Sequence, residues 1–193
     1  MVGECGTNMA MAARPPRKPR PPLDAAKLDE LALSYVGRFS TSRARLKAYL
    51  GRKLRERGWA GTGEPPIEAL TDKLAQLGYV DDRAFALAKA RSLTSRGYGS
   101  RRVRQALALA GIGAEDSGDA HELAAAEAYE AALRYARRKG IGPYADSRPD
   151  PRRRERALAA IIRAGHAFGL ARAVIDLGPG EIPNREDLSN LGA

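Results

Sequence analysis

The sequence predicts an all-α protein built as an elongated array of tandem three-helix repeats. From Leu23 to Leu177, apolar residues recur at i, i+3, i+4 and i+7, which is the spacing of amphipathic helices. Gly and Pro divide this stretch into short helices, and no segment alternates apolar and polar residues as a strand does. Three short helices bury little surface alone, so stacked units are the expected arrangement.

The first predicted repeat covers residues 23–80. Asp24 is placed to cap its first helix, since a side-chain oxygen there can accept a bond from the first turn. The second helix is expected over Ser42–Arg57. The third begins at Pro65-Pro66 and ends at Gly78, because Pro suits the start of a helix and Gly its end.

The second predicted repeat covers residues 81–118. Asp81 is expected to cap its first helix, with Phe85 on the inner face. After a Gly-rich turn, Ser100 is expected to cap the next helix, and Gly111 closes it.

The third predicted repeat covers residues 119–177. The segment Gly113–Asp119 before it is too short and too polar to predict a helix, so whether the second repeat keeps its third helix stays open. One long helix is then expected over Ala120–Lys139. Two more follow a loop rich in Gly and Pro, over Arg152–Ala164 and Phe168–Leu177.

Two tails flank the predicted repeats. Residues 1–22 are basic and Pro-rich, so they should be extended or disordered. Met9 and Met11 leave the true translation start open beside Met1. Residues 178–193 are expected to form a flexible C-terminal tail.

The net charge points to an anionic partner. The chain has 33 Lys and Arg against 23 Asp and Glu, a formal charge of +10. The N-terminal tail and each predicted repeat carry the same surplus of +3. Lys and Arg attract polyanions because each neutralised phosphate releases condensed counterions. A surplus carried unit by unit predicts a ligand with a long, repeating surface.

Three basic groups along the chain are the candidate contacts for that ligand. They are Arg43, Arg45, Lys47, Arg52 and Lys53; Arg91, Arg96, Tyr98, Arg101, Arg102 and Arg104; and Arg137, Arg138, Lys139, Arg152, Arg153 and Arg154. Residues three apart share a helix face, so Arg101 and Arg104 should point together. Cations at a helix start oppose the helix dipole at a cost of about 0.3–1 kcal/mol, which an anionic ligand would offset. The alternative is a solvated face in an Arg-rich protein.

Residues suited to catalysis are sparse. His121 and His166 lie far apart without metal-ligand spacing, and His166 is expected to make an interhelix hydrogen bond in a turn. Asp81 and Asp82 are adjacent, so on a helix they face different directions. The sequence therefore predicts a non-enzymatic protein with no cofactor and no metal site.

The compartment and assembly are predicted from what the sequence contains. Cys5 is the single cysteine, which excludes an intramolecular disulfide. No apolar run approaches the ~18–20 residues that span a bilayer. We expect a cytoplasmic monomer with no membrane contact.

Several stretches together resemble the RecX family. Leu77–Ala86, Arg96–Ser100 and Gly111-Ile112 are similar to its central motif, and Tyr135–Tyr144 and Arg163–Phe168 are similar to the C-terminal repeat of a bacterial subgroup. The motif residues expected to build the repeat are Gly78, Asp81, Asp82, Phe85, Gly97 and Gly111. One departure is the weak helix pattern where the middle repeat should have its third helix.

The resemblance implies a regulator of DNA repair and homologous recombination that belongs to the SOS response. RecX proteins have three tandem three-helix repeats, lie in the groove of the RecA filament on DNA and damp its recombinase, ATPase and coprotease activities. Some also bind single- or double-stranded DNA directly. The alternative is a stand-alone, sequence-nonspecific nucleic-acid-binding protein that does not depend on RecA. Which residues would contact RecA and which DNA stays open, as does the choice between inhibition, disassembly and activation.

Overall fold

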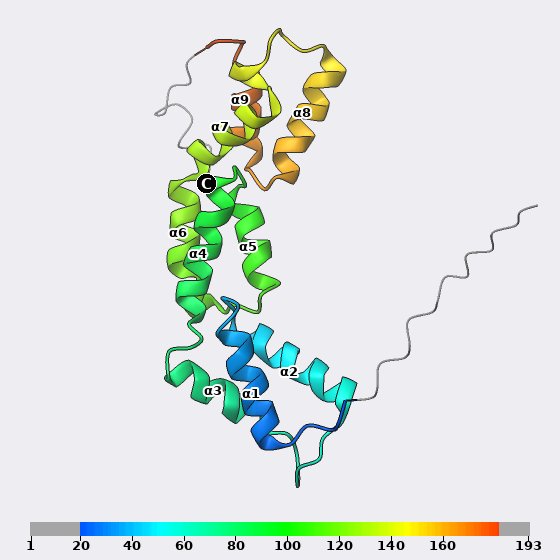
Figure 1. Ribbon diagram of the computed structural model, residues 1–193. Helices are drawn as coiled ribbons and strands as arrows, with labels where there is room; N and C mark the ends of the chain where they lie inside the picture. Colours follow the sequence, from blue (N-terminus) through cyan, green and yellow to red (C-terminus); the bar gives the residue numbers. More distant parts are fainter. Residues whose placement is uncertain (1–19, 182–193) are drawn as a thin grey trace, which may run out of the picture.

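The computed structural model describes residues 20–181 and confirms the predicted all-α fold class. Over these residues the only β feature is an isolated bridge between Leu23 and Trp59. The helices form three successive groups of three (Figure 1). They are α1 (Ala25–Val36), α2 (Arg43–Arg57) and α3 (Ile67–Gln76); α4 (Asp82–Ser95), α5 (Ser100–Ala108) and α6 (Ala114–Ala126); and α7 (Ala128–Lys139), α8 (Pro151–Arg163) and α9 (Phe168–Asp176), with a 3-10 turn η1 (Gly142–Tyr144) after α7.

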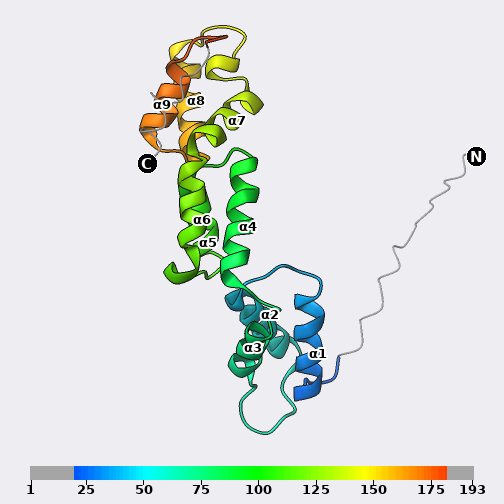
Figure 2. The same cartoon turned by 90° about the vertical axis from the view of Figure 1, so that its left-hand side faces the viewer.

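Each group of three helices has its own hydrophobic core, and we call the groups units 1, 2 and 3. Leucines such as Leu46 and Leu50 fill the core of unit 1. Unit 2 packs around alanines such as Ala86 and Ala120. Unit 3 combines aliphatic side chains with tyrosines such as Tyr135. The three cores are separate, and the units follow one another in a line (Figures 1 and 2). The molecule is therefore long and narrow.

The sequence prediction was wrong between residues 113 and 139. The segment Gly113–Asp119, where a helix was left open, is the first half of α6, and the expected long helix over Ala120–Lys139 is two helices that meet at Glu127. Glu115 and Asp116 stand in the first turn of α6, where acids interact favourably with the helix dipole. Gly118 lies where no atom comes within 4 Å of an added Cβ, so its lack of a side chain costs no packing. Unit 2 therefore keeps its third helix, which runs through the boundary predicted at residue 118.

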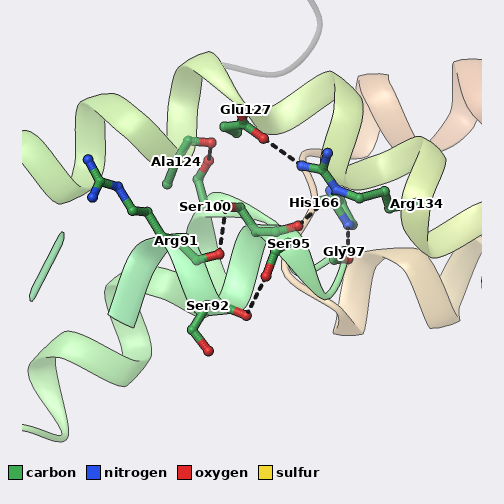
Figure 3. Close-up of polar contacts among 10 residues, drawn as sticks. Arg91, Ser92, Ser95, Gly97, Ser100, Ala124, Glu127, Arg134 and His166 are labelled. Atoms are coloured by element: carbon green, nitrogen blue, oxygen red, sulfur yellow. Dashed lines mark hydrogen bonds and ion pairs between the residues drawn. The ribbon is translucent and has the colours of Figure 1, made fainter. Parts of the chain in front are cut away.

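An ion pair holds the break between α6 and α7. The Arg134 guanidinium donates to the Glu127 carboxylate at 2.5 Å and to the Thr94 carbonyl at 3.2 Å (Figure 3). Arg134 thus ties the junction of the two helices to the end of α4. A helical periodicity can continue through such a break, so the sequence pattern did not reveal it.

The predicted helix caps were correct for α1 and α4 and wrong for α5. Asp24 accepts a hydrogen bond from the Lys27 N–H at 2.9 Å, and Asp81 accepts one from the Ala84 N–H at 2.8 Å. Ser100 lies inside α5 instead, and its hydroxyl donates to the Ala124 carbonyl at 3.0 Å (Figure 3). This bond joins the start of α5 to the end of α6.

Most of the two predicted tails lies outside the described residues. The four described residues of the C-terminal tail pack on unit 3, because the Gly180 N–H donates to the Pro143 carbonyl at 2.9 Å and Gly178 is buried. Within residues 20–181, no helix has the length and apolar character needed to cross a membrane.

Candidate nucleic-acid interface

The second helices of the three units, α2, α5 and α8, follow one another end to end along one side of the molecule (Figure 1). The start of α5 meets the end of α8, since the Gly99 N–H donates to the Ala164 carbonyl at 3.0 Å. The start of α2 meets the end of α5, since the Ser42 hydroxyl donates to the Ala110 carbonyl at 2.5 Å. We call α2, α5 and α8 the second-helix row.

The second-helix row carries the positive surplus of the protein. Its three helices hold fifteen Lys and Arg against two acids, Glu56 and Glu155, whereas the other six α-helices of the described chain sum to −1. The sequence indicated an even surplus per repeat, and the structure adds that the most basic helix of each unit lies in the second-helix row. A continuous line of cations raises the local potential for a polyanion more than scattered charges would.

The basic residues of α2 are partly committed to contacts within the protein. Lys47 forms an ion pair with Glu68, and Lys53 bonds Glu56 at 2.6 Å. Arg52 and Lys53 both lie over the Tyr49 ring. Such exposed pairs contribute little stability, about 0–1 kcal/mol, and give way readily to a stronger anion.

Two α2 residues also mark the junction of units 1 and 2. The Arg43 N–H donates to the Asp82 carboxylate at 2.9 Å, and the Arg45 guanidinium lies 5.5 Å from the centre of the Phe85 ring. A Cβ added to Gly111 would lie 2.3 Å from that of Ala44. The motif residues Asp82, Phe85 and Gly111 therefore lie where one unit meets the next.

The cations of α5 point to opposite sides of the helix. Arg101 and Arg104 line one hollow together with His121, as their spacing predicts. Arg102 lines a second hollow with Tyr98. The carbonyls at the end of α8 face the start of α5, and this negative helix end offsets part of the cost of placing cations there.

The second hollow gathers residues from α5, α7, α8 and the turn before α5. We call it the Tyr98 hollow, and its polar and aromatic lining is Tyr98, Arg102, Tyr135, Arg138, Lys139 and Arg163. Among residues 20–181, none of the residues that line it is acidic. Arg163 was absent from the candidates predicted from sequence, since only the packing of α8 against α5 brings it here.

Arg138 is held in place within the Tyr98 hollow. Its guanidinium lies 5.7 Å from the centre of the Tyr98 ring and 5.3 Å from that of Tyr135, and it donates to the Arg96 carbonyl. Arg96 also lies over the Tyr98 ring, at 5.7 Å. The Tyr135 hydroxyl donates to the Ala160 carbonyl at 3.2 Å, which fixes that ring against α8.

The remaining candidates are not brought together. Arg91 lies on α4 and lines a different hollow, which also includes Glu127 and Arg134. Arg137 lies over the Tyr144 ring at 5.0 Å. The run at residues 152–154 begins α8, about 15 Å along the helix from Arg163.

Two of these three α8 arginines face acids. Arg153 lies 3.5 Å from the Asp150 carboxylate, and Arg154 forms an ion pair with Asp176. Arg152 is exposed at the helix start. This end of α8 therefore offers fewer free cations than its sequence suggests.

His166 joins units 2 and 3 through a hydrogen bond, as the sequence predicted for this histidine. The ring is 1% exposed, and its Nε2 lies 3.0 Å from the Gly97 carbonyl (Figure 3). Burial lowers the pKa of His166, so the neutral ring with an Nε2–H donor is the stable form. Among residues 20–181, His, Cys, Asp and Glu side chains form no group of three able to hold a metal.

Comparison with known proteins shows to which family this three-unit architecture belongs. Residues 81–120 match the family model described as the second three-helix domain of RecX. The regulatory protein RecX of Myxococcus xanthus is 35% identical over 178 residues, which cover 86% of this chain and 92% of that protein. The chain belongs to the RecX family. A RecX from Mycobacteroides abscessus is 35% identical over 122 residues, covering 61% of this chain and 57% of the relative.

Solved RecX structures share the fold. The crystal structure of RecX from Lactobacillus salivarius superposes with a TM-score of 0.56 at 18% identity, over 78% of this chain and 94% of that one. A second RecX crystal structure gives a TM-score of 0.53 at 25% identity, over 73% of this chain and 67% of that one. The predicted family is confirmed, and its members from Myxococcus xanthus and Mycobacteroides abscessus are named as regulatory proteins.

Proposed function

We propose that this RecX-family chain binds the RecA–DNA filament and inhibits RecA recombinase and ATPase activity, as a monomer in the cytoplasm. The observation that carries the proposal is the second-helix row, in which cations follow one another through all three units. A filament repeats the same protein and phosphate surfaces along its length, and an in-line array can contact several repeats at once. Inhibition then requires that the chain bind one filament state more tightly than another.

The alternative is a stand-alone DNA-binding protein. It is favoured by Arg101 and Arg104, which line one hollow and form no ion pair within residues 20–181. Free cations of this kind attract any phosphate backbone, with or without RecA. The two functions differ in whether the effect on RecA survives an excess of DNA.

A titration of DNA-stimulated ATP hydrolysis by RecA tests the proposal. We expect inhibition when this chain is substoichiometric to RecA, because one bound array affects several protomers. The titration is repeated with DNA in large excess over this chain. If the chain inhibits only by occupying the DNA that RecA needs, the excess DNA removes that inhibition. Hydrolysis that stays unchanged at saturating chain would refute the proposal, and inhibition that disappears in excess DNA would support the stand-alone alternative.

A further inference from the structure

We propose that the Tyr98 hollow is a phosphate site, which holds one phosphate of a nucleic-acid strand running along the second-helix row. Contact with the phosphate alone makes this binding independent of base sequence. The inference rests on the proposed function only in that both require nucleic acid to lie on the row. It adds a defined point of contact at the junction of units 2 and 3.

The charge of the hollow calls for an anion. Arg102, Arg138, Lys139 and Arg163 line it without an acid among them. The Arg102 side chain bonds the neutral amide of Gln105 at 2.9 Å, and Lys139 and Arg163 are exposed. On α2, by contrast, Lys53 is already paired with Glu56. Four neighbouring cations repel one another, and one phosphate in the hollow would relieve that repulsion.

Arg138 is prepared for this role by the rings around it. Both Tyr98 and Tyr135 contact its guanidinium, and its bond to the Arg96 carbonyl uses one of its five N–H donors. Within residues 20–181 its other donors make no further hydrogen bond, so they are available in a fixed orientation. A side chain already ordered loses little entropy on binding, so its charge-assisted bond to a phosphate oxygen is gained at low cost.

A nucleic-acid strand fits the surroundings of the hollow better than an acidic protein does. The hollow lies where α8 meets α5, and a second basic hollow with Arg101 and Arg104 lies on the other side of α5. A strand carries one charge at every nucleotide, while the surface of a folded protein mixes acids with neutral and basic groups. A row with two acids among seventeen charged residues matches the unbroken charge of a strand.

The test compares two double variants of the full chain. K139Q/R163Q removes two exposed cations from the hollow, and K73Q/K89Q removes two from α3 and α4, outside the row. Binding to a fluorescent oligothymidylate is measured by anisotropy over a salt series, without RecA. We expect K139Q/R163Q to bind about five- to tenfold more weakly, with the slope of log affinity against log salt reduced by about 0.7 for one lost phosphate contact. K73Q/K89Q should change both quantities by much less.

A third variant and a second probe make the result specific. Arg138→Lys keeps the charge and loses the planar, ring-bound donor set, so we expect weaker binding with little change in salt slope. Equal effects of K139Q/R163Q and K73Q/K89Q would overturn the proposal, as would an unchanged salt slope for the hollow variant. Loss of binding to polyglutamate without loss of binding to the oligonucleotide would assign the hollow to an acidic protein instead. Wild-type chain that fails to inhibit RecA would refute the proposed function alone, because the anisotropy experiment contains no RecA.

Discussion

His166 and Gly97 are joined by a hydrogen bond of 3.0 Å between the ring Nε2 and a main-chain carbonyl, across 69 residues of sequence. The bond links the end of α8 to the turn that precedes α5, so a buried neutral ring holds units 2 and 3 together. Protonation would place a charge in this buried junction. The stability of the junction should therefore depend on pH.

The first prediction is that acid weakens the fold through His166. Burial lowers its pKa below the usual 6.5, so between these two values the unfolded chain binds a proton that the folded chain does not. The contribution of the neutral His166 to the free energy of unfolding is complete above pH 6.5. It decreases as the pH falls below 6.5, by at most about 1.4 kcal/mol per pH unit. Urea denaturation between about pH 5 and pH 7 measures the slope, above the range in which ordinary carboxylates titrate.

Two substitutions serve as controls for that slope. His166→Gln should remove the His166 contribution from the pH dependence, although it also lowers stability at pH 7. His121→Gln makes the same substitution at the partly exposed histidine of α6, so it controls for the loss of a histidine elsewhere in the fold. A slope that persists in the His166→Gln variant would show that another group is responsible.

The second prediction concerns the close approach of Gly99 to Gly165. A Cβ added to Gly99 would lie 2.4 Å from the Gly165 carbonyl oxygen, and main-chain atoms on both sides leave no room to adjust. Gly99→Ala should therefore destabilise the protein by about 1–3 kcal/mol. Gly118→Ala is the matched control, since nothing lies within 4 Å and Ala favours the helix by up to about 1 kcal/mol. Urea midpoints that move the same way for both variants would contradict this account.

The sequence predicted the fold where local signals were strong. Asp24 and Asp81 cap helices as expected, because a carboxylate before an apolar periodic stretch has a strong local preference for that position. The break at Glu127 escaped prediction because helical periodicity continues through it and the Arg134 contact that fixes it is tertiary. Ser100 was misassigned for a related reason, since its hydroxyl bonds the end of another helix.

The candidate site was predicted in composition but not in arrangement. The basic groups were visible as runs in the sequence, yet their alignment depends on the end-to-end contacts of α2, α5 and α8. Arg163 enters the Tyr98 hollow only through this packing. Arg154 and Lys47 lose part of their expected availability because acids distant in sequence pair with them.

The third prediction separates two serines that bond the ends of neighbouring helices. Ser42 caps α2 by accepting from the Arg45 N–H at 3.2 Å and also donates to the Ala110 carbonyl of unit 2. The Ser100 hydroxyl donates to the Ala124 carbonyl, and Ser100 is not the N-cap of α5. Ser42→Ala should cost about 1–3 kcal/mol, since a cap and a buried hydrogen bond are lost together, and Ser100→Ala about 0.5–1.5 kcal/mol. Thermal and urea unfolding would contradict this ranking if Ser100→Ala proved the more costly.

The last prediction tests whether position in the row matters more than charge alone. R101E/R104E reverses two cations of α5 that line one hollow, and K73E/K89E reverses two on α3 and α4. Both variants change the net charge equally, so a general effect of charge would weaken DNA binding alike. If the row is the binding surface, R101E/R104E should bind DNA at least about tenfold more weakly than K73E/K89E at low salt, and the difference should shrink as salt screens the repulsion. Equal affinities of the two variants in electrophoretic mobility shifts would show that Arg101 and Arg104 face solvent and do not contact DNA.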